Sequence, residues 1–345
     1  MSTTLQPSKP FQTLNQTVSP LLVTIDKHYL EVKNSKGLLL LALRLDLQQN
    51  CIAHRQSSAQ YSSIDPLLAA FEAIITQYPT INHIELVLNE WKEVSLELLV
   101  KGIAIRQENA LLVDPAMLWQ LPHLWLPEHS YPVYPQIHHR TEHHWHPIRA
   151  PKPTDYVYER FIPWLGQTIA FRAAQPERDL KQLHQWMNDP HIAEFFQEEG
   201  DLSYHAKYLN DRIEDPHMIP LIGEFNHIPF GYFEIYWAKE NRISPYYDAH
   251  DYDRGWHVLV GEAAYRGRQW ISAWLPSLMH YLFLADPRTQ RIVGEPQADH
   301  HQQIRNLEKS GFARLKEFDF PHKKAALVML LREHYFSKKL WTPAI

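Results

Sequence analysis

The chain contains 345 residues, of which 45% are hydrophobic and 21% are charged, a composition typical of ordinary globular proteins of about two domains. Only 11 residues are glycine, and no two of them stand in a G-x-G arrangement. Loops that hold phosphate on backbone N–H groups need several closely spaced glycines. The sequence therefore argues against a dinucleotide-binding fingerprint and against a P-loop.

Charge and cysteine content narrow the partners and the compartment. The formal net charge is −5 and the basic residues are scattered, which argues against a nucleic-acid surface. Cys51 is the single cysteine, so a disulfide framework and a zinc site built of cysteines are excluded. The sequence shows neither a signal-peptide pattern nor an 18-residue apolar stretch. We expect a cytoplasmic protein that contacts no membrane.

Residues 1–121 predict an N-terminal accessory domain of mixed α/β structure. The apolar spacing of Asp65–Gln77 predicts a helix, with Asp65 as its N-cap and Pro66 at its first position. No catalytic constellation is found in this half of the chain. Short apolar segments predict strands at Leu21–Ile25, Leu38–Leu45, Cys51–His54 and Ile84–Leu88.

Residues 122–155 differ from both flanking regions, because they contain seven prolines and seven histidines. Such a proline density prevents a continuous helix or a central strand, and we interpret the segment as an extended linker on the surface. Histidine clusters can bind metal, but no metal-ligand motif accompanies these. We predict solvated side chains and no metal at His138, His139, His143, His144 and His146.

From Thr168 onward the predicted elements follow the order βααβββαβαββ, which places an α/β (α+β) domain at residues 156–345. The expected helices are Pro176–Met187, Ser203–Ile213, Ile271–Leu284 and His301–Ser310. The expected strands are Thr168–Ala174, Pro220–Phe225, Pro229–Trp237, Gly255–Gly261, Arg291–Glu295, Phe312–Phe318 and Lys324–Leu331.

Six sequence strings follow one another in this half of the chain: FGYFEIYW (Phe230–Trp237), DYDRGWHVLVGE (Asp251–Glu262), YRGR (Tyr265–Arg268), HYLFLADPRT (His280–Thr289), GEP-x-AD (Gly294–Asp299) and DFPHKKAAL (Asp319–Leu327). The strings and the element order resemble the GNAT acyltransferase fold, in the branch that acylates N-hydroxylated amines during hydroxamate siderophore assembly. That branch includes the aerobactin-pathway N-hydroxylysine acetyltransferases and the mycobactin-pathway lysine acyltransferase. The resemblance covers about residues 160–336.

The resemblance implies an enzyme that uses acetyl-CoA or another acyl-CoA as co-substrate and no metal. The implied acceptor is a small N-hydroxylated amine, such as hydroxyputrescine, hydroxycadaverine or N6-hydroxylysine, and the product is a hydroxamate. Other enzymes of the same pathway are the implied partners. A thioester is already activated, so proximity and oxyanion stabilisation can supply most of the catalysis without an enzyme nucleophile.

Two side chains are the catalytic candidates. His257 interrupts an apolar strand and matches the family's active-site histidine, although a lone strand histidine is more often structural. Asp299 follows the GEP string and matches the family's catalytic aspartate; its plain structural role would be to cap the next helix. We assign Asp299 as the proton acceptor and His257 as the group that orients the N–OH or polarises the carbonyl, with an exchange of roles left open.

The candidate coenzyme A site is a strand followed by a helix N-terminus. The fold implies that backbone groups of Val258, Leu259 and Val260 contact pantetheine. Free N–H groups of the first helical turn suit pyrophosphate, and Arg266 and Arg268 add positive charge. The family's Gln/Arg-x-x-Gly-x-Gly/Ala pattern is incomplete here, so a cationic surface turn is the alternative. The predicted cradle comprises Tyr265, Arg266, Gly267, Arg268, Gln269 and Trp270.

The acceptor site is predicted from aromatic and acidic residues. These could form a slot for a distal ammonium, or they could pack the core edge while the aspartates are solvated. Where relatives read NDPR-V, this chain has His191, which favours a decarboxylated diamine as acceptor. The predicted substrate-binding residues are Tyr236, Trp237, Tyr247, Asp248 and His191, with Tyr246 and Asp251 beside them.

Two alternative functions remain open at this point. The protein could be a GNAT acetyltransferase that acts on ordinary amines, or a non-catalytic protein that binds acyl-CoA as a scaffold.

Overall fold

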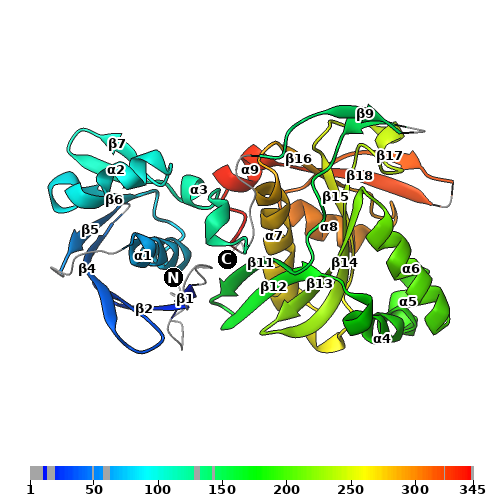
Figure 1. The fold of residues 1–345 in the computed structure, drawn as a ribbon, viewed down its shortest axis with the longest axis horizontal. Coiled ribbons are helices and arrows are strands. Elements are labelled where there is room, and N and C mark those ends of the chain that lie inside the picture. The colour runs from blue at the N-terminus through cyan, green and yellow to red at the C-terminus, as the bar shows by residue number, and fades with distance from the viewer. Residues whose placement is uncertain are drawn as a thin grey trace. The chain divides into compact units, whose positions relative to one another are not determined.

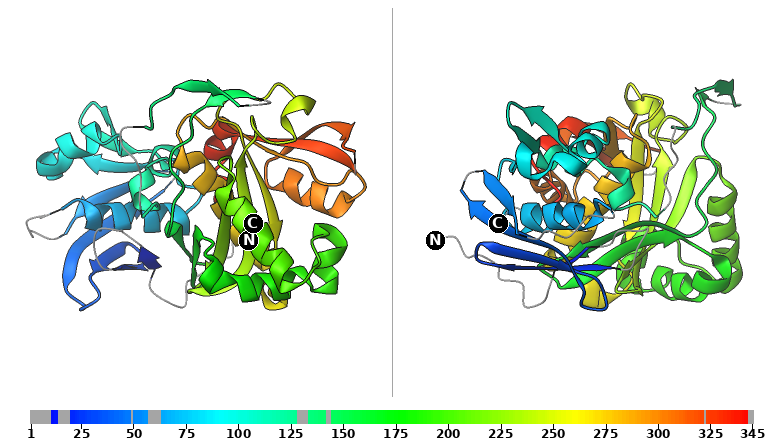
Figure 2. Two further views of the ribbon diagram at one scale, coloured as in Figure 1. Left: turned by 45° about the vertical axis from the view of Figure 1, so that its right-hand side comes forward. Right: turned by 60° about the vertical axis from the view of Figure 1, so that its left-hand side comes forward.

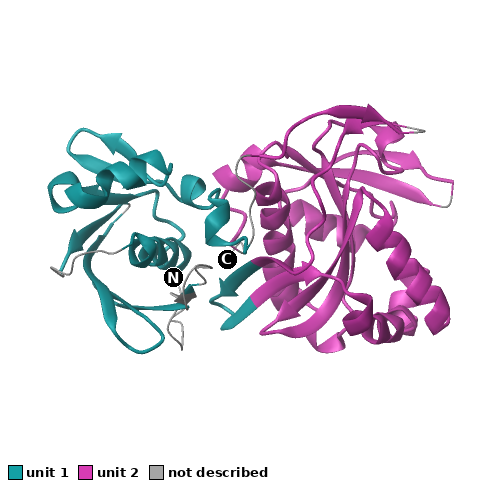
Figure 3. Cartoon of the chain, viewed as in Figure 1, with its two compact units in different colours: residues 1–127, 159–168 teal, residues 128–158, 169–345 magenta. Residues whose placement is uncertain are grey.

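The computed structural model describes residues 11–13, 20–48, 50–56, 63–127, 133–141, 144–321 and 323–342 (Figure 1). The chain divides into two compact units (Figure 3): one contains residues 1–127 and 159–168, and the other contains residues 128–158 and 169–345. The sequence-based boundaries at 121 and 155 stay a prediction.

The C-terminal half is built on an eight-stranded sheet with the order β11-β12-β13-β14-β15-β16-β18-β17. Neighbouring strands from β12 to β15 pair antiparallel, β15 and β16 pair parallel, and β18 pairs antiparallel with β16 and β17. The strands are β11 (Tyr156–Ile162), β12 (Gln167–Ala173), β13 (Met218–Phe225), β14 (Ile228–Trp237), β15 (Arg254–Leu259), β16 (Arg291–Gly294), β17 (Ala313–Asp319) and β18 (Lys324–Leu331).

Helices cover both faces of this sheet (Figures 1 and 2). On β14, Tyr232 packs in a buried cluster with side chains of α4, α5 and α6, while the next residue, Phe233, contacts Trp274 of α7. Because successive side chains of a strand point to opposite faces, α4–α6 and α7 lie on opposite sides. The helices are α4 (Pro176–Met187), α5 (Pro190–Phe196), α6 (Leu202–Glu214), α7 (Arg268–Ala285), α8 (His301–Lys309) and α9 (Arg332–Ser337). No described helix has the length and apolarity needed to cross a membrane.

The predicted GNAT fold is confirmed, and the structure adds strand β11 and helix α5 to the predicted order. Helix α7 begins at Arg268, three residues before the predicted start, and α5 was not expected after the proline of the NDP sequence. The same residues that end α4 start α5: Asp189 caps it by accepting the His191 N–H at 2.8 Å, and Pro190 fits the first turn.

The N-terminal half contains its own eight-stranded sheet, with the order β1-β2-β3-β4-β5-β6-β8-β7. The predicted helix at 65–77 is confirmed, but Ile64 and not Asp65 occupies the N-cap position. The strands are β1 (Phe11–Thr13), β2 (Leu21–Asp26), β3 (Tyr29–Lys33), β4 (Leu39–Leu47), β5 (Cys51–Arg55), β6 (Ile84–Val87), β7 (Ile105–Gln107) and β8 (Ala110–Val113); the helices are α1 (Asp65–Gln77), α2 (Lys92–Val100) and α3 (Pro115–Leu118).

The two sheets have the same strand order. In each, an antiparallel series of strands ends on one parallel pair, β5–β6 or β15–β16, and the eighth strand in chain order lies between the sixth and the seventh. Helix α1 connects β5 to β6 as α7 connects β15 to β16. The N-terminal sheet has no counterpart of α4–α6, since a turn at residues 27–28 joins β2 to β3.

The proline- and histidine-rich segment is not a plain extended linker. Strands β9 (His138–Arg140) and β10 (Trp145–Pro147) form an antiparallel pair. The expectation of solvated histidines is wrong at two positions: His146 is buried with its Nδ1 2.9 Å from Glu240, and His138 Nε2 lies 2.7 Å from Asp251. His143 lies outside the described residues, and no metal-binding group of three or more His, Cys, Asp or Glu is found within them.

Candidate active site

Strands β15 and β16 pair over only two residues and then separate. Arg254 pairs with Ile292 and Gly255 with Val293, whereas on its other edge β15 stays paired with β14 as far as Leu259. Beyond Gly255 the edge of β15 that faces β16 therefore has backbone groups without a strand partner. The separation expected beside Val258, Leu259 and Val260 is present, and we call the space between the two strands the groove.

His257 lies on β15, two residues past Gly255, which is the last residue of that strand to pair with β16. The His257 side chain is 24% exposed. Both ring nitrogens contact carboxylates: Nδ1 is 2.9 Å from Oε2 of Glu234, and Nε2 is 2.9 Å from Oε1 of Glu295. Glu234 is the cross-strand neighbour of His257 on β14, and Glu295 follows β16. Three neighbouring strands thus bring the three side chains together.

Each carboxylate is held by further donors. Tyr208 and Tyr232 donate their hydroxyl groups to Glu234, and Arg212 approaches it at 3.2 Å. Glu234 is buried because it lies under α6, which supplies Tyr208 and Arg212. Buried carboxylates remain ionised only when several donors compensate for the lost hydration, and here they do.

Glu295 has a similar set of donors. Tyr236 donates its hydroxyl to Oε2 at 2.8 Å, Arg242 lies 3.8 Å from Oε1, and the Lys323 ammonium donates to the backbone carbonyl of Glu295 at 2.8 Å. The ring of Tyr236 also lies against the imidazole of His257, with centroids 5.0 Å apart. Tyr236 is therefore the one predicted substrate residue that contacts the candidate histidine directly.

Electrostatics favour a charged histidine. Burial lowers the pKa of His257, but the hydrogen bonds and negative charges of Glu234 and Glu295 outweigh burial and raise that pKa to about 9. Burial raises the pKa of each carboxyl group, and the contacts with His257 outweigh it, so both pKa values fall to about 2. At neutral pH the three groups are an imidazolium between two carboxylates.

The start of α7 has the features of a phosphate cradle. Gly267 precedes the helix with φ = 106° and provides no side-chain cap, so the backbone N–H groups of Arg268 and Gln269 stay available, while that of Trp270 donates to the Gly267 carbonyl at 3.2 Å. Arg268 is exposed and its side chain has no partner among the described residues, while the buried indole N–H of Trp270 is an unsatisfied donor there. These residues fit a bound pyrophosphate, with Gln269 exposed beside them.

Arg266 has a different role from the one predicted. Its Nε donates to the carbonyl of Val260 at 3.1 Å and its Nη2 to that of Gly261 at 2.9 Å, with Asp189 at 3.5 Å. The guanidinium thereby holds the end of the strand segment against the α4–α5 turn. Arg268, and not Arg266, is the arginine free to meet phosphate.

Two predicted cradle residues are aromatic packing residues. Tyr265 stacks on Phe225 at 5.5 Å, and Trp270 contacts both Phe225 and Tyr265. They form the base on which the turn and the start of α7 rest.

Asp299 lies in the turn between β16 and α8, where it is exposed. The predicted capping role is not observed, because His300 occupies the N-cap position and no side chain caps the helix. The Asp299 carboxylate has no hydrogen bond or ion pair to any residue that the structure describes. An exposed and unpaired carboxylate is suited to accept a proton.

An aromatic contact joins this turn to α5. Phe195, 57% exposed, stacks on His300 with centroids 5.3 Å apart, and the ring of His191 meets Phe195 edge-on at 5.8 Å. His191 is thus on the helix that contacts the turn carrying Asp299. We call the three aromatic side chains of His191, Phe195 and His300 the rim.

The other predicted substrate residues do not join this rim. Trp237 is buried between the guanidinium groups of Arg149 and Arg254, 4.2 and 3.9 Å from its ring centre. Tyr247 donates its hydroxyl to Asp253 at 2.9 Å. Because side chains alternate along β14, Trp237 faces away from His257, so the predicted slot is not formed.

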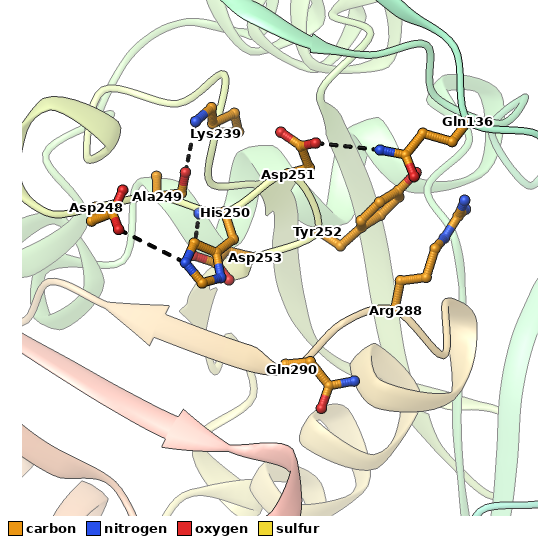
Figure 4. Close-up of a pocket in the computed structure, with 10 residues that line it drawn as sticks. All are labelled: Gln136, Lys239, Asp248, Ala249, His250, Asp251, Tyr252, Asp253, Arg288 and Gln290. Carbon is orange, nitrogen blue, oxygen red and sulfur yellow. Dashed lines mark hydrogen bonds and ion pairs between the residues drawn. The ribbon is translucent and has the colours of Figure 1, made fainter.

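Asp248 lies at a separate cavity of 540 Å³ (Figure 4). The cavity lies beside the ends at which β15 and β16 begin, whereas the groove opens toward their other ends. Most of its charged side chains are already paired, as Asp251 is with Gln136 and His138. It is lined by Gln136, Lys239, Asp248, Ala249, His250, Asp251, Tyr252, Asp253, Arg288 and Gln290.

Comparison with known proteins agrees with this geometry. Residues 175–320 match the family model described as an acetyltransferase (GNAT) domain. An N(6)-hydroxylysine O-acetyltransferase of Escherichia coli is 37% identical over 79% of this chain and 85% of its own length. The chain belongs to this GNAT acyltransferase family. The siderophore-branch resemblance drawn from the six strings is confirmed.

Two further similarities extend the comparison. An N(5)-hydroxyornithine:cis-anhydromevalonyl coenzyme A-N(5)-transacylase of Beauveria bassiana is 42% identical over 59% of this chain and 45% of its own length. The crystal structure of an uncharacterized protein from Bacillus halodurans is similar with a TM-score of 0.51 and 29% identity, over 55% of this chain and 96% of the other. The family accounts for the C-terminal sheet and groove.

Sequence reasoning missed the two glutamates. Glu234 is a charged residue within the apolar string FGYFEIYW, and Glu295 is the charged residue of GEP. Both therefore stood out from the uncharged residues around them. A carboxylate inside a buried strand needs a partner, which was the available signal. The partner could not be named, because it is supplied by a neighbouring strand distant in sequence.

Proposed function

We propose that the protein is an acyl-CoA-dependent N-acyltransferase that converts an N-hydroxylated diamine or amino acid to a hydroxamate. The observation that carries the proposal is the groove between β15 and β16, with an open strand edge, a helix N-terminus with a free arginine and His257 beside the opening. Relatives that act on hydroxylysine and hydroxyornithine support the acceptor class.

The chain's residues divide the work of acyl transfer. Acyl-CoA supplies an activated thioester. The first turn of α7 and Arg268 hold its phosphates, and the strand edge at Val258–Val260, apart from the Val260 carbonyl that Arg266 occupies, holds the pantetheine arm. His257 provides positive charge beside the carbonyl oxygen on which negative charge develops.

Proton transfer is assigned to Asp299. As the nitrogen of the acceptor forms its bond to the acyl carbon, the carbon–sulfur bond breaks and coenzyme A leaves. The nitrogen's proton passes to the Asp299 carboxylate. A hydroxylamine nitrogen is weakly basic and already neutral near pH 7, so the carboxylate needs to act only as the transfer proceeds.

The acceptor class can be narrowed by His191. Relatives with arginine at this position have a permanent cation for a substrate carboxylate, whereas a histidine side chain carries no permanent positive charge. We therefore favour hydroxyputrescine or hydroxycadaverine over N6-hydroxylysine. The acyl group is acetyl in the simplest form of the proposal.

Mass spectrometry of products from hydroxylated diamines, hydroxylated amino acids and their plain amines, each with several acyl-CoAs, tests the proposal. A ferric hydroxamate colour identifies transfer to nitrogen. The name of the E. coli relative specifies an O-acetyltransferase, and an O-acyl product without this colour would favour that second activity. Turnover of plain amines only, or binding without turnover, would contradict the proposal.

A further inference from the structure

Glu234 and Glu295 occupy both nitrogens of His257, and the geometry restricts where the protons are. A neutral imidazole has one N–H and one lone pair. With a carboxylate oxygen 2.9 Å from each nitrogen, a neutral ring would direct its lone pair at an ionised oxygen. Both contacts are hydrogen bonds only if the ring donates twice, as an imidazolium does.

The alternative position for the proton is a carboxyl group, and the surrounding donors disfavour it. Oε1 of Glu234 accepts from the hydroxyl groups of Tyr208 and Tyr232, and Oε2 faces His257. Oε2 of Glu295 accepts from Tyr236, and Oε1 faces His257. One oxygen of each carboxyl group therefore accepts from tyrosine hydroxyl groups, and this hydrogen bonding favours the ionised form of both carboxyl groups.

We propose that Glu234 and Glu295 are positioning residues that hold His257 as a fixed imidazolium in the groove. This deepens the role of the site and rests on the proposed function. His257 then has no lone pair with which to accept a proton. It acts by its charge and its fixed orientation, and the exchange of roles with Asp299 is excluded.

The pH dependence of the variant Glu295→Gln distinguishes the two roles by sign. An amide keeps the shape but removes one negative charge, so the pKa of His257 falls toward its ordinary value. If the cation is the active form, activity of the variant falls as pH rises from 6 to 9 and recovers toward the wild type at low pH. A histidine that acts as a base would give the opposite slope.

Glu240→Gln is the matched control, because Glu240 is also a buried glutamate 2.9 Å from a histidine nitrogen, that of His146, but lies outside the groove. We expect its pH profile to follow the wild type. NMR titration of the His257 ring gives an independent readout. We expect protonation through pH 8 in the wild type and a pKa at least one unit lower in Glu295→Gln.

The two proposals can fail separately. If no acceptor is turned over, the proposed function fails while the NMR titration still tests the positioning role. A His257 pKa near 6.5 in the wild type, an unshifted pKa in Glu295→Gln, or activity of that variant that rises with pH would overturn the inference.

A second inference rests on the strand order of the N-terminal sheet. The parallel pair β5–β6 also spans two residues, Cys51–Ile84 and Ile52–Glu85, before the strands separate. His54 lies two residues past the last pair, as His257 does in the other sheet. A glutamate from beyond the partner strand again meets the ring: Nδ1 of His54 is 3.2 Å from Glu90.

In the N-terminal sheet, other residues of the protein fill the space between β5 and β6 past their last pair. Trp91, fully buried, directs its indole N–H to the carbonyl of Ala53 at 3.4 Å, and Glu90 accepts the backbone N–H of Arg55 at 3.1 Å. These are backbone groups of the β5 segment past its last pair with β6. We infer that residues 11–127 contain a closed counterpart of the acyltransferase groove that binds no acyl-CoA.

Calorimetry with coenzyme A tests the closure, using the wild type and Arg268→Glu. We expect one coenzyme A per chain in the wild type, and at most one, bound more weakly, in the variant. Two per chain, or one site whose affinity is the same in both proteins, would overturn the closure. No binding to the wild type would agree with the closure and contradict the proposed function.

Discussion

Nε2 of His257 lies 2.9 Å from Oε1 of Glu295, although His257 lies on β15, Glu295 follows β16, and the two are 38 positions apart in the chain. The contact forms at the point where β15 and β16 separate, so it marks the groove as well as the charge state of the histidine. Loss of His257 would leave two buried carboxylates without the cation that they share, whereas loss of Glu295 would leave His257 paired with Glu234 alone.

Replacing His257 or Asp299 should impair turnover. We expect His257→Asn and Asp299→Asn each to lower kcat by well over tenfold, since the first removes a charge beside the developing oxyanion and the second removes the proton acceptor. Steady-state kinetics with the preferred hydroxylated amine measure the effect. Asp211→Asn, an exposed aspartate of α6, is the control. Wild-type rates in both variants would remove the assignment.

Stability should depend on pH through the same cluster. The pKa of His257 is raised to about 9, so its contribution is complete below its ordinary value of 6.5 and is lost as pH rises through 9. The pKa values of Glu234 and Glu295 are lowered to about 2, so their contribution is complete above 4.5 and is lost as pH falls through 2. Urea unfolding from pH 3 to 10 should show a smaller decline on the alkaline side in His257→Asn than in the wild type; equal declines would contradict the assignment.

The cradle should respond to changes at the start of α7. We expect Arg268→Gln to raise the KM for acyl-CoA about tenfold, because a charge-assisted hydrogen bond contributes about 1.5–3 kcal/mol, with little change in the acceptor KM. Initial rates at varied acyl-CoA measure this. Lys207→Gln is the matched control, because Lys207 is an exposed cation of α6. An unchanged KM in Arg268→Gln would show that the phosphates bind elsewhere.

Close packing beneath Tyr236, which contacts both His257 and Glu295, should make any side chain at Gly255 destabilising. A Cβ at this position would lie 2.3 Å from the ring of Tyr236 and 2.5 Å from its hydroxyl oxygen. We expect Gly255→Ala to lower the free energy of unfolding by about 1–3 kcal/mol, the usual cost of overpacking, and to weaken the contact of Tyr236 with Glu295. Gly294→Ala, a strand glycine where the new Cβ would come no closer than 3.1 Å to its neighbours, is the comparison with a milder contact. Denaturant unfolding measures both, and equal losses would contradict the steric explanation.

Acceptor choice should shift with the charge at position 191. His191→Arg places a permanent cation on α5, beside the turn of Asp299. We expect the ratio of kcat/KM for N6-hydroxylysine to that for hydroxycadaverine to rise about tenfold, consistent with about 1.5–3 kcal/mol for a hydrogen bond to a charged group. An unchanged ratio would separate His191 from acceptor recognition.

The sequence by itself determined most of the elements and their order. Period-two strands, the helix start at Pro176 and the six strings were enough to predict the GNAT sheet, the groove strand and the candidate His257, because each signal is local. Local signals also predicted a cradle at residues 265–270, which in the structure include the start of α7.

Only the tertiary structure decided which partners the charged side chains contact. It paired Arg266 with backbone carbonyls and left Arg268 free, placed Trp237 on the face away from His257, and brought Glu234 and Glu295 to one imidazole. It also gave the first half of the chain the strand order of the second without any shared string. Strand pairing joins residues tens of positions apart, and neither composition nor local periodicity encodes which strand becomes the neighbour.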